Sequence, residues 1–355
     1  MDKSDIIELT IGTYTHGVTA DRGIFRAWVS ADGSRIESRG VTPVTPTVNP
    51  TWVVFSADGR FVYAACEGQE GGVAALKLNA EGGLSLLGIQ PTGGSETCHV
   101  ALVNGGTHLV AADYASGSIA VHPVLADGSL GKRTDFVQHV GSGPYTERQA
   151  AAHAHMIAED PDCQHLLALD LGTDTVYAYV LDPSAGTLAE STRSVLPGAF
   201  GPRHLVFHPG ADFELVYVLG ELGFDIAVCE YDGKSGALNP VSFVSVAEDG
   251  VLGVDYPSGI RVTPDGRFLY VAVRGRDLLL TYSLADPRKP ELVSSVPTGG
   301  SWPRDIVLSP AGTLLFSANQ LDDVITVFSL DPVSGVPSPT GATLELPAPA
   351  CVLMR

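Results

Sequence analysis

The feature that most constrains the fold is an internal repeat, which is visible six times between residues 49 and 331. Each copy contains an apolar segment, a turn such as SADG or TPDG, a second apolar segment, a polar loop and a third segment of alternating polarity. Short segments of this kind between glycine-containing turns are typical of β-strands. Equivalent positions lie 46 to 56 residues apart: Trp52, His99, His155, His204, Gly259 and Asp305.

A period of this length with three or four strands per unit is typical of the blades of a β-propeller. The two ends of the chain contain further strand-like segments, IELTIGTYT and GIFRAWVSADGSRI at the start and GATLELPAP at the finish. Together they predict a seventh blade built from both termini, which closes the ring and removes its open edges. Because no linker or change in composition divides the chain, we predict one all-β domain over residues 1–355, a seven-bladed β-propeller.

The composition agrees with this fold and excludes several classes of protein. The 40 glycines and 24 prolines are too many for a helical protein. With 40 acidic and 21 basic residues the formal net charge is −19, which disfavours nucleic acids and anionic membranes as partners. No segment reaches the roughly 18 apolar residues of a membrane span, and the N-terminus lacks the pattern of a signal peptide. We therefore expect a cytoplasmic protein.

The sequence predicts neither a metal nor a cofactor. The five cysteines are scattered and odd in number, without the spacing of a zinc site or of a disulfide framework. They are expected to pack as small apolar side chains. The segment HAH at residues 153–155 contains two histidines but has no recognisable third and fourth ligand.

Polar residues at the start of the innermost strands are the candidates for a functional site. Those strands line the centre of a propeller, so residues far apart in the sequence meet at one end of it. One set of such positions contains Arg203 and Arg304, and the next contains His99, His155 and His204. A third set follows the second strand of each copy: Glu67, Tyr114, Leu171, Glu221, Arg274 and Gln320.

Three arginines on one rim of an acidic protein indicate an anion-binding site, because a guanidinium group presents paired donors to a carboxylate or phosphate. We predict that Arg203, Arg274 and Arg304 bind a small anionic substrate, with His204 and Gln320 as further contacts. A single polar residue at a strand end is more often structural than functional. The prediction therefore depends on the whole set.

The motifs IGTYT, NPTW, SADGRF, TPDGRFLYVA, HAH, GPRH and WPRD resemble the lactonase family of seven-bladed β-propellers over nearly the whole chain. That family includes a bacterial type of 6-phosphogluconolactonase and the fungal 3-carboxy-cis,cis-muconate lactonising enzyme. The resemblance implies a small carboxylated or phosphorylated lactone as substrate and leaves the direction of reaction open. The proposed active-site groups of the fungal enzyme correspond here to His153, Arg203, Glu221 and Arg274.

Lactone chemistry in either direction requires stabilisation of charge and a group that transfers a proton. We assign the arginines to the first role and His153 or Glu221 to the second, with His155 orienting or sharing it. No GxSxG motif points to a covalent acyl-enzyme. Residues 138–152, an insertion ahead of HAH, are expected to form a lid or a pocket wall, and a solvated surface loop is the alternative.

Two other functions remain open from the sequence. A non-catalytic propeller would act as a ligand-binding or interaction platform, and it should expose an apolar or aromatic patch on one face. A metal-dependent propeller of the gluconolactonase type would need carboxylate and Asn ligands that converge on the channel.

Overall fold

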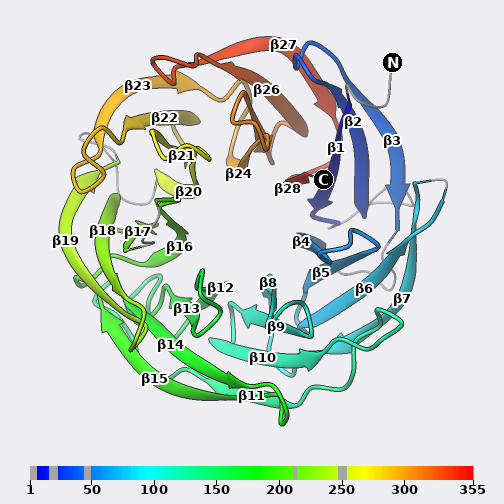
Figure 1. Ribbon diagram of the computed structural model, residues 1–355, viewed down its shortest axis with the longest axis vertical. Coiled ribbons are helices and arrows are strands. Elements are labelled where there is room, and N and C mark those ends of the chain that lie inside the picture. Colours follow the sequence, from blue (N-terminus) through cyan, green and yellow to red (C-terminus); the bar gives the residue numbers. More distant parts are fainter. Residues whose placement is uncertain are drawn as a thin grey trace.

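The computed structural model describes residues 6–15, 23–43, 49–80, 82–210, 214–246 and 254–354. It contains seven antiparallel sheets of four strands each, arranged as blades around a central axis (Figure 1). The predicted seven-bladed propeller is therefore confirmed. None of the described residues belongs to a helix long and apolar enough to cross a membrane.

Within six of the blades, consecutive strands run from the axis to the periphery. The first of these blades comprises β4 (Asn49–Phe55), β5 (Phe61–Glu67), β6 (Gly72–Leu78) and β7 (Leu84–Pro91). The next two comprise β8 (Thr97–Val103), β9 (His108–Asp113), β10 (Ser118–Pro123) and β11 (Asp135–Gln138), then β12 (Ala154–Glu159), β13 (Leu166–Asp170), β14 (Thr175–Asp182) and β15 (Thr187–Val195). The following two comprise β16 (Pro202–Phe207), β17 (Leu215–Gly220), β18 (Asp225–Asp232) and β19 (Ala237–Ser245), then β20 (Tyr256–Val262), β21 (Phe268–Arg274), β22 (Leu278–Ser283) and β23 (Glu291–Pro297). The sixth comprises β24 (Pro303–Leu308), β25 (Leu314–Asn319), β26 (Val324–Leu330) and β27 (Pro337–Glu345).

The seventh blade joins the two ends of the chain, as predicted. Its innermost strand β28 (Pro349–Met354) pairs with β1 (Ile6–Thr13), and β2 (Ile24–Ser30) and β3 (Ile36–Thr42) follow outward. The blue β1 and the red β28 lie side by side in Figure 1.

The prediction of which C-terminal segment closes the ring was wrong. Most of GATLELPAP belongs to β27, the outer strand of the preceding blade. β27 alternates between buried and exposed residues, as a peripheral strand does, whereas the first four residues of β28 are all buried. Only a strand that packs on both faces can occupy the axial position.

Seven hydrophobic clusters hold the ring together, and each is shared by two neighbouring blades. Leu9 and Val352 of the closing blade, for example, pack with Phe316 and Val327 of the β24–β27 blade. The closing blade packs equally on its other side, where Ile24 and other residues contact the β4–β7 blade. Every blade is therefore stabilised by both of its neighbours, and closure completes the last two interfaces.

Every innermost strand carries one extra residue near its start. In β16, Pro202 pairs with Gly220 and His204 with Leu219, so Arg203 is left out of the ladder. Such a β-bulge changes the direction of the side chain. We call the extra residues the bulge ring: Thr51, Cys98, His155, Arg203, Ser258, Arg304 and Ala350.

The bulges correct one position of the sequence alignment. The repeats aligned Ala154 with Arg203 and His155 with His204, but the pairing of β12 leaves His155 out of the ladder. His155 is therefore equivalent to Arg203, and Met156 is equivalent to His204. The alignment was shifted because HAH offers two histidines, and spacing alone does not locate a bulge.

Closure of the ring depends on a glycine beside the bulge of β28. A Cβ atom on Gly12 would lie 2.4 Å from the Pro50 carbonyl oxygen and 3.0 Å from Cys351 Sγ. We expect Gly12→Ala to lower the free energy of unfolding by about 1–3 kcal/mol, as overpacking generally does. Gly88→Ala on β7 is the control, because a Cβ there meets nothing within 4 Å. Equal melting temperatures for the two variants would contradict this expectation.

Candidate functional site

Four of the eight predicted site residues, His155, Glu221, Arg274 and Arg304, line one cavity of about 210 Å³. Its lining consists of Tyr14, Glu67, Glu96, Cys98, Tyr114, Arg148, His155, Glu221, Arg274 and Arg304. All seven blades contribute to this set. A space lined by every blade lies on the axis of the ring, so the cavity is the end of the propeller at which the bulges are found.

A much smaller space of about 10 Å³ adjoins this cavity and shares three of its residues, Cys98, His155 and Arg304. Six of the seven members of the bulge ring line it. The rings of Trp52, His99 and His204 pack together beside it, with centroids 4.5 to 6.0 Å apart. The bulge ring thus lies between the cavity and an aromatic cluster inside the propeller.

Glu221 is the electrostatic centre of the cavity wall. Its Oε2 accepts hydrogen bonds from Arg203 Nε at 2.9 Å and Arg274 Nη2 at 2.7 Å, and its Oε1 accepts one from Arg148 Nη2 at 2.7 Å. Burial alone would raise the pKa of this carboxyl group, but Arg274, Arg203 and Arg148 outweigh burial and hold the pKa far below its ordinary value. A carboxylate with so low a pKa is a weak base. The geometry therefore gives Glu221 the role of orienting arginines.

Arg203 lines the small space but not the larger cavity. It is 2% exposed, and its Nη1 donates to the carbonyl oxygen of Ser258 in the next blade and contacts the His204 ring. Arg203 thereby connects two blades and fixes Glu221. Its contact with a substrate, like that of His204, stays a prediction.

Arg304 is the cavity arginine with the freest guanidinium group. Its Nη2 lies 3.8 Å from Glu67 Oε2, beyond hydrogen-bond distance, and within the described part of the chain the group makes no hydrogen bond. Glu67 accepts instead from the hydroxyl groups of Tyr14 at 2.9 Å and Thr51 at 2.7 Å. Burial would lower the pKa of Arg304, but Tyr14 and Glu67 raise it overall. The guanidinium group is therefore charged and available.

His155 lines both spaces as a neutral imidazole. It is 7% exposed, and its Nδ1 is buried without a hydrogen-bond partner among the described residues. Burial, together with the charge of Arg203, lowers the pKa of His155 well below its ordinary value. The ring therefore offers one N–H and one lone pair to a ligand near neutral pH, but it is a weak base.

His153 and Gln320 lie outside the lining of the larger cavity. His153 Nδ1 donates to the Tyr114 carbonyl oxygen at 2.9 Å, which leaves Nε2 as the acceptor, and its ring stacks on Tyr114 at 4.6 Å. Gln320 donates its backbone N–H to Trp302, and its side-chain oxygen is buried without a partner in the described structure. Their roles toward a substrate stay predictions.

Sequence reasoning did not identify Arg148, Tyr14 or Glu96 as site residues. Arg148 belongs to the insertion 138–152 and donates to both Glu221 and the Tyr114 hydroxyl, so this insertion forms part of the cavity wall, as expected. Tyr14 follows β1 as Glu221 follows β17, but the divided seventh blade was outside the alignment of six repeats. Glu96 precedes β8 at a position that the alignment did not include.

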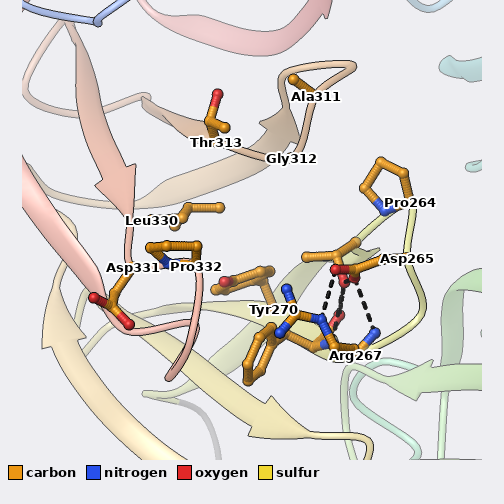
Figure 2. A pocket seen from close by; sticks show the side chains of 12 residues that line it. Pro264, Asp265, Arg267, Tyr270, Ala311, Gly312, Thr313, Leu330, Asp331 and Pro332 are labelled. Carbon is orange, nitrogen blue, oxygen red and sulfur yellow. Dashed lines mark hydrogen bonds and ion pairs between the residues drawn. The ribbon is translucent and has the colours of Figure 1, made fainter.

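A second cavity, of about 160 Å³, lies at the opposite end of β20 and β24 from their bulges (Figure 2). Its charged groups are engaged in local turns. Asp265 accepts from Arg267 Nε at 2.7 Å and from Thr263 Oγ1 at 2.6 Å, and Asp331 accepts from the Ser334 amide. The axial cavity is therefore the better candidate for a functional site.

The potential metal ligands and the thiols of the described ranges are the remaining reactive groups. Within them, no group of three or more His, Cys, Asp or Glu side chains is arranged to hold a metal ion. All five cysteines are free, and Cys98 is the one that lines the cavity. Burial raises the pKa of Cys98 above its ordinary value, so it remains a thiol.

Comparisons with known proteins agree with the fold and identify the family. Residues 8–354 match the family described as "Lactonase, 7-bladed beta-propeller". The chain is 34% identical over 348 residues to 6-phosphogluconolactonase of Bacillus subtilis strain 168, and the match covers 96% of each chain. A putative 6-phosphogluconolactonase of Bacteroides fragilis superposes with a TM-score of 0.90 at 28% identity, over 100% of this chain and 99% of that one. The periplasmic gluconolactonase of Pseudomonas aeruginosa gives 0.89 at 29% identity, over 98% and 99%. This chain therefore belongs to the lactonase family of seven-bladed β-propellers.

Proposed function

We propose that this protein hydrolyses the lactone of a small sugar acid that carries an anionic group, as the name of its relative 6-phosphogluconolactonase implies. The observation that carries the proposal is the convergence of Arg148, Arg274 and Arg304 on one axial cavity in a protein of net charge −19. Guanidinium groups form strong, directional hydrogen bonds to phosphate and carboxylate. The volume of about 210 Å³ suits a ligand smaller than the drug-sized molecules that fill about 300–1,000 Å³.

We assign a different role in the reaction to each of the polar residues at the cavity. Arg304, whose donors are free, binds the anionic group of the substrate. Arg148 and Arg274, oriented by Glu221, face the carbonyl oxygen, on which negative charge develops when water attacks. The neutral imidazole of His155 donates a hydrogen bond to the ring oxygen that becomes the leaving alcohol. His153 stacks on Tyr114 and keeps Nε2 as an acceptor, so in this state it can take a proton but does not donate one.

Two further expectations belong to this proposal. We place the protein in the cytoplasm, because its five free cysteines agree with a reducing compartment. We also favour an enzyme over an interaction platform. Exposed large apolar side chains in the described part of the chain are mostly Val and Leu of outer strands and loops, and Phe243 is the only aromatic one among them.

A panel of lactones tests the function. We expect hydrolysis of 6-phosphogluconolactone, with kcat/KM about ten- to a hundredfold higher than for gluconolactone, because one charged hydrogen bond contributes about 1.5–3 kcal/mol. Proton release in weak buffer measures both reactions. Muconolactones in the same panel test the lactonising type of chemistry. Absence of hydrolysis with every lactone would overturn the proposal.

A further inference from the structure

Three carboxylates line the cavity, and they differ in how fully they are engaged. Glu221 accepts hydrogen bonds from three arginines, and Glu67 accepts from two hydroxyl groups. The Glu96 carboxylate makes no hydrogen bond and no ion pair with the described residues, and Glu96 is exposed to solvent. Glu96 is therefore the one cavity carboxylate whose lone pairs are free for a water molecule or a substrate.

The backbone around Glu96 shows that its side chain is tolerated at a position better suited to glycine. Its carbonyl oxygen accepts from the Tyr114 amide at 2.9 Å, and its φ is 55°, in the left-handed region. The same hydrogen bond and a positive φ recur at equivalent positions in three other blades, at Gly201 (φ 62°), Trp302 (φ 63°) and Ala348 (φ 41°). The conformation therefore recurs in four blades, and glycine adopts it at no steric cost whereas glutamate adopts it at a cost of about 1 kcal/mol.

We infer that Glu96 is the general base that activates water in the hydrolysis proposed above, on which this inference rests. The other candidate bases are less suitable: Glu221 is neutralised by arginines, His155 has a strongly lowered pKa, and His153 does not line the cavity. A base must keep a lone pair within reach of the attacking water. Glu96 meets this requirement, because it lines the cavity and its carboxylate has no ion-pair partner among the described residues.

The step balances as follows. Glu96 takes one proton from water while the water oxygen bonds to the lactone carbonyl carbon, and the carbonyl oxygen becomes an oxyanion beside the guanidinium groups. When the oxyanion collapses, the bond from the carbonyl carbon to the ring oxygen breaks. The ring oxygen receives a proton from the His155 N–H, and Glu96 returns its proton to that imidazole. The product is the open hydroxy acid, which releases its own proton to solvent, and both side chains regain their initial states.

The variant Glu96→Gly distinguishes the catalytic role of the carboxylate from the conformational cost of the backbone. It removes the base and also the steric cost of the left-handed conformation, so we expect an unchanged or higher melting temperature. The kcat should be about 10²- to 10⁴-fold lower, and KM should stay within a few-fold of wild type. Ala348→Gly is the matched control, because it relieves the same conformation in another blade without removing a functional group. It should leave kcat unchanged. Glu96→Gln, which keeps the size of the side chain but removes the base, should lower kcat as Glu96→Gly does.

The possible results distinguish this inference from the function on which it rests. A wild-type protein without activity on any lactone overturns both. An active wild type with a Glu96→Gly variant that retains kcat within tenfold overturns the assignment of the base alone. A rise in KM at constant kcat also overturns it, because it would show that Glu96 binds substrate hydroxyl groups and takes no proton.

Discussion

Glu221→Ala is expected to lower the free energy of unfolding by about 3–5 kcal/mol, which is typical when one partner of a buried ion pair is removed. The substitution leaves Arg203 and Arg274, which are 2% and 5% exposed, without their carboxylate. Urea denaturation measures the loss. The control is Glu190→Ala, because the Glu190–Arg193 pair lies on an outer strand and is exposed to solvent. Such a pair contributes about 0–1 kcal/mol. Equal losses in the two variants would show that Glu221 does not hold the arginines together.

The same carboxylate makes the free energy of unfolding depend on pH in a definite direction. The pKa of Glu221 in the folded protein lies far below its ordinary value of 4.5. Its stabilising contribution is therefore fully present above that ordinary value and is lost as the pH falls toward the folded pKa. The difference in unfolding free energy between wild type and Glu221→Gln should be constant between pH 6 and 8 and should shrink below about pH 4.5. A difference that grows in acid would contradict the network of charges described here.

Arg304→Ala is expected to lower kcat/KM for an anionic lactone about ten- to a hundredfold, mainly through KM, while the melting temperature stays close to that of wild type. The two effects separate because the Arg304 guanidinium group makes no hydrogen bond within the described structure. Arg304→Lys should recover part of the loss, since an ammonium group keeps the charge but not the planar pair of donors. Steady-state kinetics and thermal denaturation provide the two measurements.

Two controls make the result for Arg304 specific. Arg267→Ala removes an exposed arginine that pairs with Asp265 at the other end of the propeller, and it should alter neither quantity. An unphosphorylated lactone should be affected less than a phosphorylated one by Arg304→Ala. A variant that unfolds more easily but binds both lactones normally would make Arg304 a structural residue.

The fold was predictable because the sequence of most blades repeats the same pattern of strand, turn and strand. The closing strand was not, since GATLELPAP and PACVLM both read as strands, and only packing on both faces assigns PACVLM to the axis. Glu221 and Arg274 were placed correctly at the rim because they stand at the ends of equivalent strands, β17 and β21. Their partnership was not predictable, because Arg148 reaches Glu221 from an insertion whose path depends on tertiary contacts such as those of Gln149 with Leu171 and Asp174.

The extra residue in each innermost strand has a consequence for how this protein can be altered. A residue outside the ladder contributes no strand pairing of its own, so its identity is set by what it faces at the axis. The seven blades indeed carry threonine, alanine, serine, cysteine, histidine and two arginines there. Arg203 and Ser258 are exceptions, because their side chains also join neighbouring blades. Libraries confined to the other positions would sample new substrate preferences without changing the sheets, and variants that lose activity should still be recovered as folded protein.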